Sequence, residues 1–169
     1  MCIRDSFVVF LSEDLKLSRV VAGLGFGTLH MGGMIGLIIW GRFSDSLFSA
    51  DRRLSLFIIE LSTGFLYLIF GLFLHHSQGS QGIVFILLFL LGFFSLGWTG
   101  VYLTTVGEVA GGKRAGIATG LALFFIRIGM LVAPPVFGFI ADIYGNYEYS
   151  WLLFSVVIMG ISSLFLLRN

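Results

Sequence analysis

Arg127 is the most informative of the few ionisable residues that fall inside long apolar runs of this chain. Because a guanidinium does not release its proton, it needs an anion or a water-filled cavity when apolar surroundings enclose it. We interpret Arg127 as a binding group for the carboxylate or phosphate of a small solute. The alternative is a permanent partner within the protein, either a carboxylate or backbone carbonyls.

His30 and Glu60 are the other ionisable side chains within apolar runs. His30 lies among Gly23, Gly27 and Gly33, small residues that permit close helix packing. Its imidazole could bind solute or transfer protons, or a neutral ring could hydrogen-bond across a helix interface. Glu60 lies about 9 Å into its apolar run at the helical rise per residue, near enough to reach the headgroup region. We therefore favour a structural position for Glu60 over proton coupling.

Polar side chains also follow one face of a third apolar run. Ser95, Thr99 and Tyr102 are spaced as i, i+4 and i+7, which places them together on one helix. We expect this stripe to line a cavity, with hydrogen bonding between helices as the alternative. In the next run Pro134 and Pro135 interrupt the backbone hydrogen bonds, and a kink is expected there.

The composition shows what kind of element must position these residues. Of 169 residues, 57% are hydrophobic and 11% are charged, against about 25% charged in soluble domains. A soluble domain of this size could not bury so much apolar surface, which excludes a soluble enzyme, a nucleic-acid-binding protein or a disordered linker. The net charge of +1 and the single cysteine indicate no nucleic-acid partner and no cysteine-rich metal site. With no catalytic constellation in the sequence, we expect no enzyme, no cofactor and no metal.

Hydropathy predicts an all-α, polytopic transmembrane helical bundle, because the apolar runs are continuous and long enough to cross a bilayer. The predicted spans are about 20–40, 54–74, 83–106, 115–141 and 151–167, after a shorter run at 7–11. Antiparallel spans place six basic residues on one side, namely Arg42, Arg52, Arg53, Lys113, Arg114 and Arg168, against Lys16 and Arg19 on the other. The positive-inside rule then places the Arg52–Arg53 loop and the carboxyl terminus in the cytoplasm. We expect the protein to lie in the plasma membrane.

The loop after the first full span carries a glycine, a small residue, an aspartate and then a basic pair. These residues are Gly41, Ser44, Asp45, Arg52 and Arg53. The pattern resembles the loop signature of the major facilitator superfamily, although Ser46 stands where that signature has a basic residue. An aspartate and arginines at helix ends can hold neighbouring helices together in one state and release them in another.

Two further stretches are similar to the same family. Glu108 followed by Lys113 and Arg114 resembles the acidic-then-basic loop before the eleventh helix, and the prolines with Trp151 resemble that helix and its outer loop. The resemblance implies a six-helix carboxyl-terminal half of a twelve-helix fold, with its first helix truncated. It also implies that His30, the Ser95 stripe and Arg127 fall on helices that line the cavity.

The resemblance implies secondary active transport of a small solute by alternating access, with the solute bound between two halves in mid-membrane. Arg127 favours an organic anion, and coupling to protons or sodium is left open. The expected partners are the lipid bilayer, a missing amino-terminal six-helix half and the solute, and the fragment alone is expected to be inactive. The alternative is a small helical membrane protein that acts as an assembly partner or sensor without transport.

The first six residues resemble translated sequencing-adapter sequence. We therefore treat 1–6 as a non-native scar and 7–169 as the half-domain. On this interpretation the natural protein begins upstream.

Overall fold

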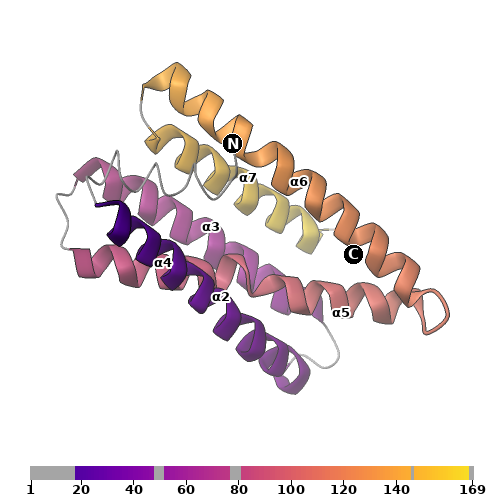
Figure 1. Cartoon of the computed structure of the whole chain (residues 1–169). Helices are drawn as coiled ribbons and strands as arrows, with labels where there is room; N and C mark the ends of the chain where they lie inside the picture. Colours follow the sequence, from indigo (N-terminus) through magenta and orange to yellow (C-terminus); the bar gives the residue numbers. More distant parts are fainter. Residues whose placement is uncertain (1–17, 48–51, 77–80, 146, 168–169) are drawn as a thin grey trace.

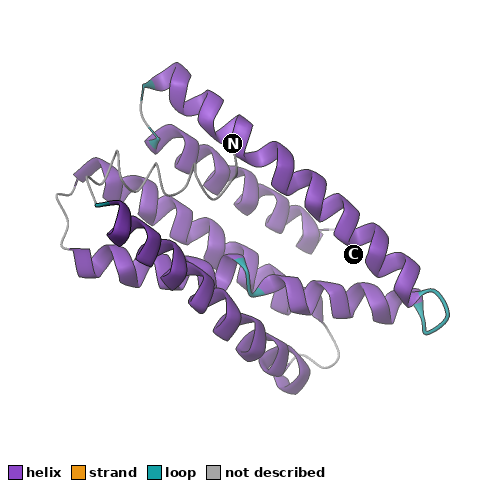
Figure 2. Ribbon diagram, in the orientation of Figure 1, coloured by secondary structure: helices purple, strands orange, loops and turns teal. Residues whose placement is uncertain are grey.

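The computed structural model describes residues 18–47, 52–76, 81–145 and 147–167. These residues form six helices and no strand (Figures 1 and 2), which confirms the prediction of an all-α bundle. The helices are α2 (Arg19–Leu47), α3 (Arg52–His76), α4 (Gln81–Ser95), α5 (Trp98–Ala110), α6 (Ala115–Tyr144) and α7 (Glu148–Leu167). The predicted scar at 1–6, the short apolar run at 7–11 and Arg168 lie outside the described residues.

Four segments are long and apolar enough to cross a membrane, and α7 is a shorter apolar helix. They are Arg19–Ser46, Arg52–Leu72, Gln81–Ala110 and Ala115–Tyr144. Several helices continue past the apolar runs that hydropathy marks. Asp45 and Arg52, for example, are both helical although both are charged. The chain therefore has the helices of an integral membrane protein.

The third predicted span is a single membrane-spanning segment that consists of two helices, α4 and α5. The expectation of one continuous helix there is therefore wrong. Between α4 and α5, the N–H of Thr99 donates to the carbonyl of Leu96, three residues back, at 3.4 Å. Figure 2 shows this break as a short loop inside the bundle. At the break, a Cβ added to Gly97 would lie 2.8 Å from Cδ1 of Trp40 on α2. Glycine therefore allows α2 to approach the chain closely where the helix is interrupted.

Helix α2 packs against α4 through glycines on both helices. A Cβ added to Gly32 or Gly36 would collide with a backbone carbonyl of Phe89 or Phe93 respectively. A Cβ at Gly92 of α4 would likewise collide with a carbonyl of α2. Backbones this close gain van der Waals contact without a side chain between them.

Of the three glycines expected to pack beside His30, only Gly33 lies close to another segment of the bundle. A Cβ added to Gly33 would lie 2.6 Å from Cδ1 of Leu96, but a Cβ added to Gly23 or Gly27 would meet no atom of another segment within 4 Å. The reason is that the glycines of α2 lie on two faces. One face packs against α4, and Gly23, Gly27 and the exposed His30 lie on the other.

Two apolar clusters hold the bundle together. The first joins α2, α3, α4 and α7, and its buried members are Ala22, Phe70, Val84, Leu88, Leu91 and Trp151. The second joins α2, α3 and α5, and its buried members are Trp40, Leu56, Ile59 and Val101. Helix α6 contacts α5 and α7, and its most apolar stretch has no buried residue. It is therefore the least covered of the described spans.

Candidate functional site

Arg52 joins the ends of three helices. From the first turn of α3, its Nη1 lies 2.9 Å from Oδ1 of Asp45, near the end of α2. Its Nε lies 2.7 Å from Oε2 of Glu108 and its Nη2 donates to Oε1 of that carboxylate at 2.8 Å, near the end of α5. This pairing uses the planar fork of the guanidinium, which a lysine could not reproduce. We call Asp45, Arg52 and Glu108 the Arg52 cluster.

The Arg52 cluster is suited to reversible contact. The side chain of Arg52 is 18% exposed, whereas those of Asp45 and Glu108 are 63% and 54% exposed. Water can therefore solvate both carboxylates if the helix ends separate. Ion pairs with exposed partners contribute about 0.2–1 kcal/mol each, so the cluster can hold the three ends together without locking them.

The second apolar cluster connects the same three helices as the Arg52 cluster. Trp98 and Tyr102 of α5 are partly buried and pack against it, with their ring centroids 5.3 Å apart. Tyr102, a predicted cavity-lining residue, packs part of its ring against the apolar core of α2, α3 and α5 and leaves part of its surface exposed. The ion pairs of the Arg52 cluster and the second apolar cluster therefore hold α2, α3 and α5 together at the end of the bundle where Arg52 lies.

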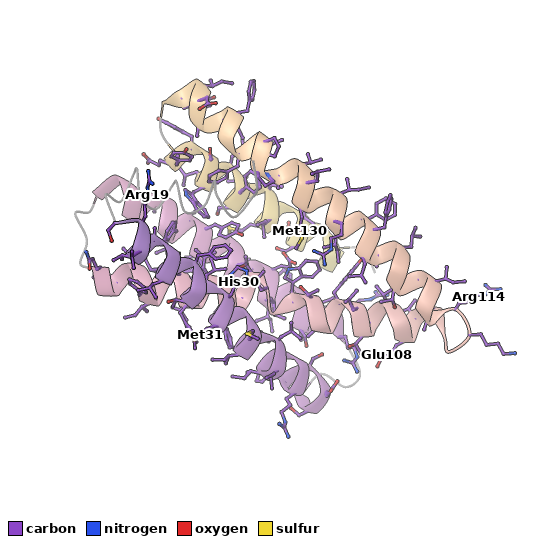
Figure 3. The ribbon with its side chains drawn as sticks, in the orientation of Figure 1. Arg19, His30, Met31, Glu108, Arg114 and Met130 are labelled. Carbon is purple, nitrogen blue, oxygen red and sulfur yellow. The ribbon has the colours of Figure 1, made fainter. Side chains whose placement is uncertain are left out.

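The other residues of the two loop motifs have different surroundings. Ser44 is fully buried, whereas a Cβ added to Gly41 would meet no atom of another segment within 4 Å and Arg53 is exposed. Arg114 is the exposed N-cap residue of α6 and forms no ion pair with a described residue. Figure 3 shows Glu108 and Arg114 at the same end of the bundle.

Arg127 lies near the middle of α6 and has no carboxylate partner among the described residues. Its Nη1 lies 3.7 Å from Sδ of Met130, a weak acceptor, and the side chain is exposed. The two prolines run inside α6 without ending it. Since Pro134 and Pro135 have no N–H, the carbonyls one turn earlier lose their usual helical donors. The middle of α6 thus combines a cation with backbone acceptors.

The other candidate residues make contacts that do not involve Arg127. Nδ1 of His30 lies 3.0 Å from the carbonyl of Phe26, and the two rings lie 4.2 Å apart. Thr99 donates to the carbonyl of Leu96 at 3.0 Å, and the break separates Thr99 and Tyr102 from Ser95 at the end of α4. Within the described residues, no hydrogen bond or ion pair joins His30, Thr99 and Arg127.

Glu60 is half-buried on α3, one turn before Gly64. A Cβ added to Gly64 would lie 2.5 Å from Cγ of Met159, so this face of α3 packs against α7.

Sequence reasoning missed Trp40 and Ser55. Their burial depends on contacts between helices, which no local pattern reveals.

The chain matches the family model of the Major Facilitator Superfamily over residues 5–169. It is 26% identical to a probable hexose phosphate transport protein of Chlamydia pneumoniae over 99% of this chain and 35% of that protein. It is 28% identical to the protein of the same description from Chlamydia muridarum, over 95% of this chain and 35% of that protein. It is 31% identical to the membrane sensor protein UhpC of Escherichia coli, over 98% of this chain and 36% of that protein.

The chain spans about a third of the length of these curated relatives and has no significant match to a solved structure. The family and the hexose phosphate transport proteins agree with the expectation of a transporter and not an enzyme. The family match covers nearly the whole chain, and the helical membrane bundle agrees with it. The chain belongs to the Major Facilitator Superfamily.

Proposed function

We propose that this chain forms one half of a secondary transporter for a small anionic solute, and that a hexose phosphate is the class to test first. The observation that carries the proposal is the guanidinium of Arg127, whose one polar side-chain contact among the described residues is the thioether of Met130, in the middle of an apolar helix. A phosphate dianion would supply the missing counter-charge and accept paired hydrogen bonds from the guanidinium fork. The relatives described as hexose phosphate transport proteins support this choice of solute.

Arg127 is assigned the role of binding the anion directly. Ser95, Thr99, Tyr102 and His30 are assigned to the walls of the solute pathway, where hydroxyl and imidazole groups can contact the hydroxyls of a sugar. The solute pathway lies between this half and an amino-terminal half in the complete protein. Coupling to a proton or sodium gradient is kept as an open alternative to exchange of one anion for another.

The Arg52 cluster is assigned the role of a gate. While its ion pairs are made, the ends of α2, α3 and α5 are held together and close the pathway on that side. When they break, the exposed carboxylates become solvated and the ends separate, as alternating access requires. We place this end of the bundle in the cytoplasm, because the basic loop residues gather there.

The test is uptake by the full-length protein in proteoliposomes. We expect accumulation of a radiolabelled hexose phosphate and none of the unphosphorylated hexose, because only the phosphate provides the charge that Arg127 requires. Equal accumulation of the two sugars would contradict the proposed role of the anion. Protein-free liposomes serve as the control for leakage.

A second function is favoured by one observation, the 31% identity to a membrane sensor protein over nearly the whole chain. A sensor on this fold would bind the same class of anion without carrying it across. Binding of the hexose phosphate, measured by calorimetry, without accumulation in the uptake test would identify this second function.

A further inference from the structure

Three polar side-chain atoms are buried at the junction of α2, α3 and α5 without a hydrogen-bond partner among the described residues. They are Nε1 of Trp40, Oγ of Ser44 and Oγ of Ser55. Both serines are fully buried, and Trp40 is 8% exposed. A buried donor or acceptor that is left unpaired costs free energy, so a group of three requires a physical explanation.

All three atoms belong to residues next to the Arg52 cluster. Ser44 directly precedes Asp45 on α2, and Ser55 follows Arg52 by three residues on α3. Trp40 lies one turn before Ser44 and belongs to the second apolar cluster, which joins the same helices. The unpaired atoms therefore lie where the proposed gate must open.

Buried hydroxyls in other parts of the bundle do have partners. Oγ of Ser155 donates to the carbonyl of Gly64 at 2.8 Å, and Oγ1 of Thr63 donates to the carbonyl of Ile59 at 2.8 Å. A serine or threonine in a helix can usually reach a carbonyl of the preceding turn. The absence of such bonds at Ser44 and Ser55 is thus a local feature of this junction.

We propose that these unpaired groups weaken the closed arrangement of the Arg52 cluster, so that the closed and open states have similar free energies. In the closed state the ion pairs stabilise the junction while the buried N–H and hydroxyl groups destabilise it. When the helix ends separate, water reaches these groups and removes that cost. The junction then behaves as a two-state element that solute binding can bias. This inference rests on the proposed function of the Arg52 cluster as a gate.

The experiment measures the reactivity of a cysteine introduced into the second apolar cluster, beside the proposed gate, in the full-length protein in nanodiscs. Val101 is 1% exposed within the second apolar cluster, so a thiol introduced by Val101→Cys reacts with a charged methanethiosulfonate only when the junction opens. We expect Ser44→Ala and Ser55→Ala each to slow the labelling about tenfold, because the closed state no longer buries an unpaired hydroxyl. Trp40→Phe, which removes the N–H and keeps an aromatic ring, acts in the same direction.

The matched control is Ser162→Ala, which removes a buried hydroxyl that donates to the carbonyl of Met159 in its own helix and lies outside the junction. Its labelling rate is expected to equal that of the parent. Arg52→Ala should accelerate labelling, because it removes the ion pairs.

Unchanged or faster labelling of both serine variants, with Arg52→Ala accelerated, would overturn this inference and leave the gate intact. If Arg52→Ala labels no faster than the parent, the gate itself is wrong, and this inference fails with it.

Discussion

Arg52 and Arg127 are both arginines on membrane-spanning helices, but their surroundings differ completely. Arg52 has two carboxylates between 2.7 and 2.9 Å from its nitrogens. Arg127 has the sulfur of Met130 at 3.7 Å and no carboxylate partner among the described residues. A paired arginine near a helix end can hold helices together, whereas an unpaired one in mid-span attracts an anion. The proposed function therefore assigns gating to Arg52 and solute binding to Arg127.

The residue with the clearest stabilising contact is Ser155, which bonds α7 to the carbonyl of Gly64 on α3. We expect Ser155→Ala to lower the free energy of unfolding in detergent by about 0.6–1.7 kcal/mol, the average and the largest values found for hydrogen bonds between membrane helices. Ser163→Ala is the control, because Ser163 is exposed and bonds only to Gly160 of its own helix. Equal stability of the two variants in a urea titration would show that the contact with Gly64 contributes nothing.

The residues that sequence reasoning found are those whose chemistry is visible without neighbours. A guanidinium in an apolar run is unusual in any fold, so the sequence alone identifies Arg127 as a candidate. The loop motif likewise singled out Asp45 and Arg52. The contact of Arg52 with Glu108, 56 residues away, and the burial of Ser55 depend on how α3 meets α2 and α5. The sequence of one helix does not show which residues of other helices it will contact.

At the scale of the elements, the break between α4 and α5 is the feature that hydropathy could not predict. Ser95, Leu96 and Gly97 are as acceptable in a continuous membrane helix as in an interrupted one. The interruption lies where Trp40 approaches Gly97, a contact that belongs to the packing of α2 on α4 and α5. The number and position of the long spans, in contrast, follow from apolar length alone.

The close packing of α2 and α4 predicts that small size is essential at particular glycines. We expect Gly92→Ala to lower the free energy of unfolding by about 1–3 kcal/mol, because the added methyl collides with a backbone carbonyl of α2 that cannot rotate away. Gly160→Ala on α7 is the matched control, since no atom lies within 4 Å of its added Cβ. If denaturant titration in detergent gives both variants the same midpoint, the packing described for α2 and α4 is incorrect.

At the scale of the whole molecule, the bundle has one strongly basic end. The turn between α5 and α6 contains Lys113 and Arg114 and lies at the same end as Arg52. At the opposite end of α6, its last residue Tyr144 is exposed. The positive-inside rule therefore predicts the orientation of the full-length protein.

We expect a cysteine introduced by Gly112→Cys in a cysteine-free background to react with an impermeant maleimide in inside-out vesicles and not in intact cells. Tyr144→Cys, at the other end, is expected to give the reverse pattern. Both positions are exposed in the structure, so accessibility across the membrane is the only difference between them. Labelling of Gly112→Cys in intact cells would reverse the orientation and would place the proposed gate on the outer side.

The central claim is that Arg127 binds the anionic group of a transported solute, and the most direct test is uptake of a hexose phosphate by Arg127 variants of the full-length protein. We expect Arg127→Ala to lower kcat/KM by about 100-fold, because the phosphate would lose its charged partner. Arg127→Lys should retain part of the activity, since it keeps the charge but not the fork. Arg19→Ala, an exposed arginine at the opposite end of α2 from the Arg52 cluster, should transport normally. Wild-type uptake by well-expressed Arg127→Ala protein would contradict the account.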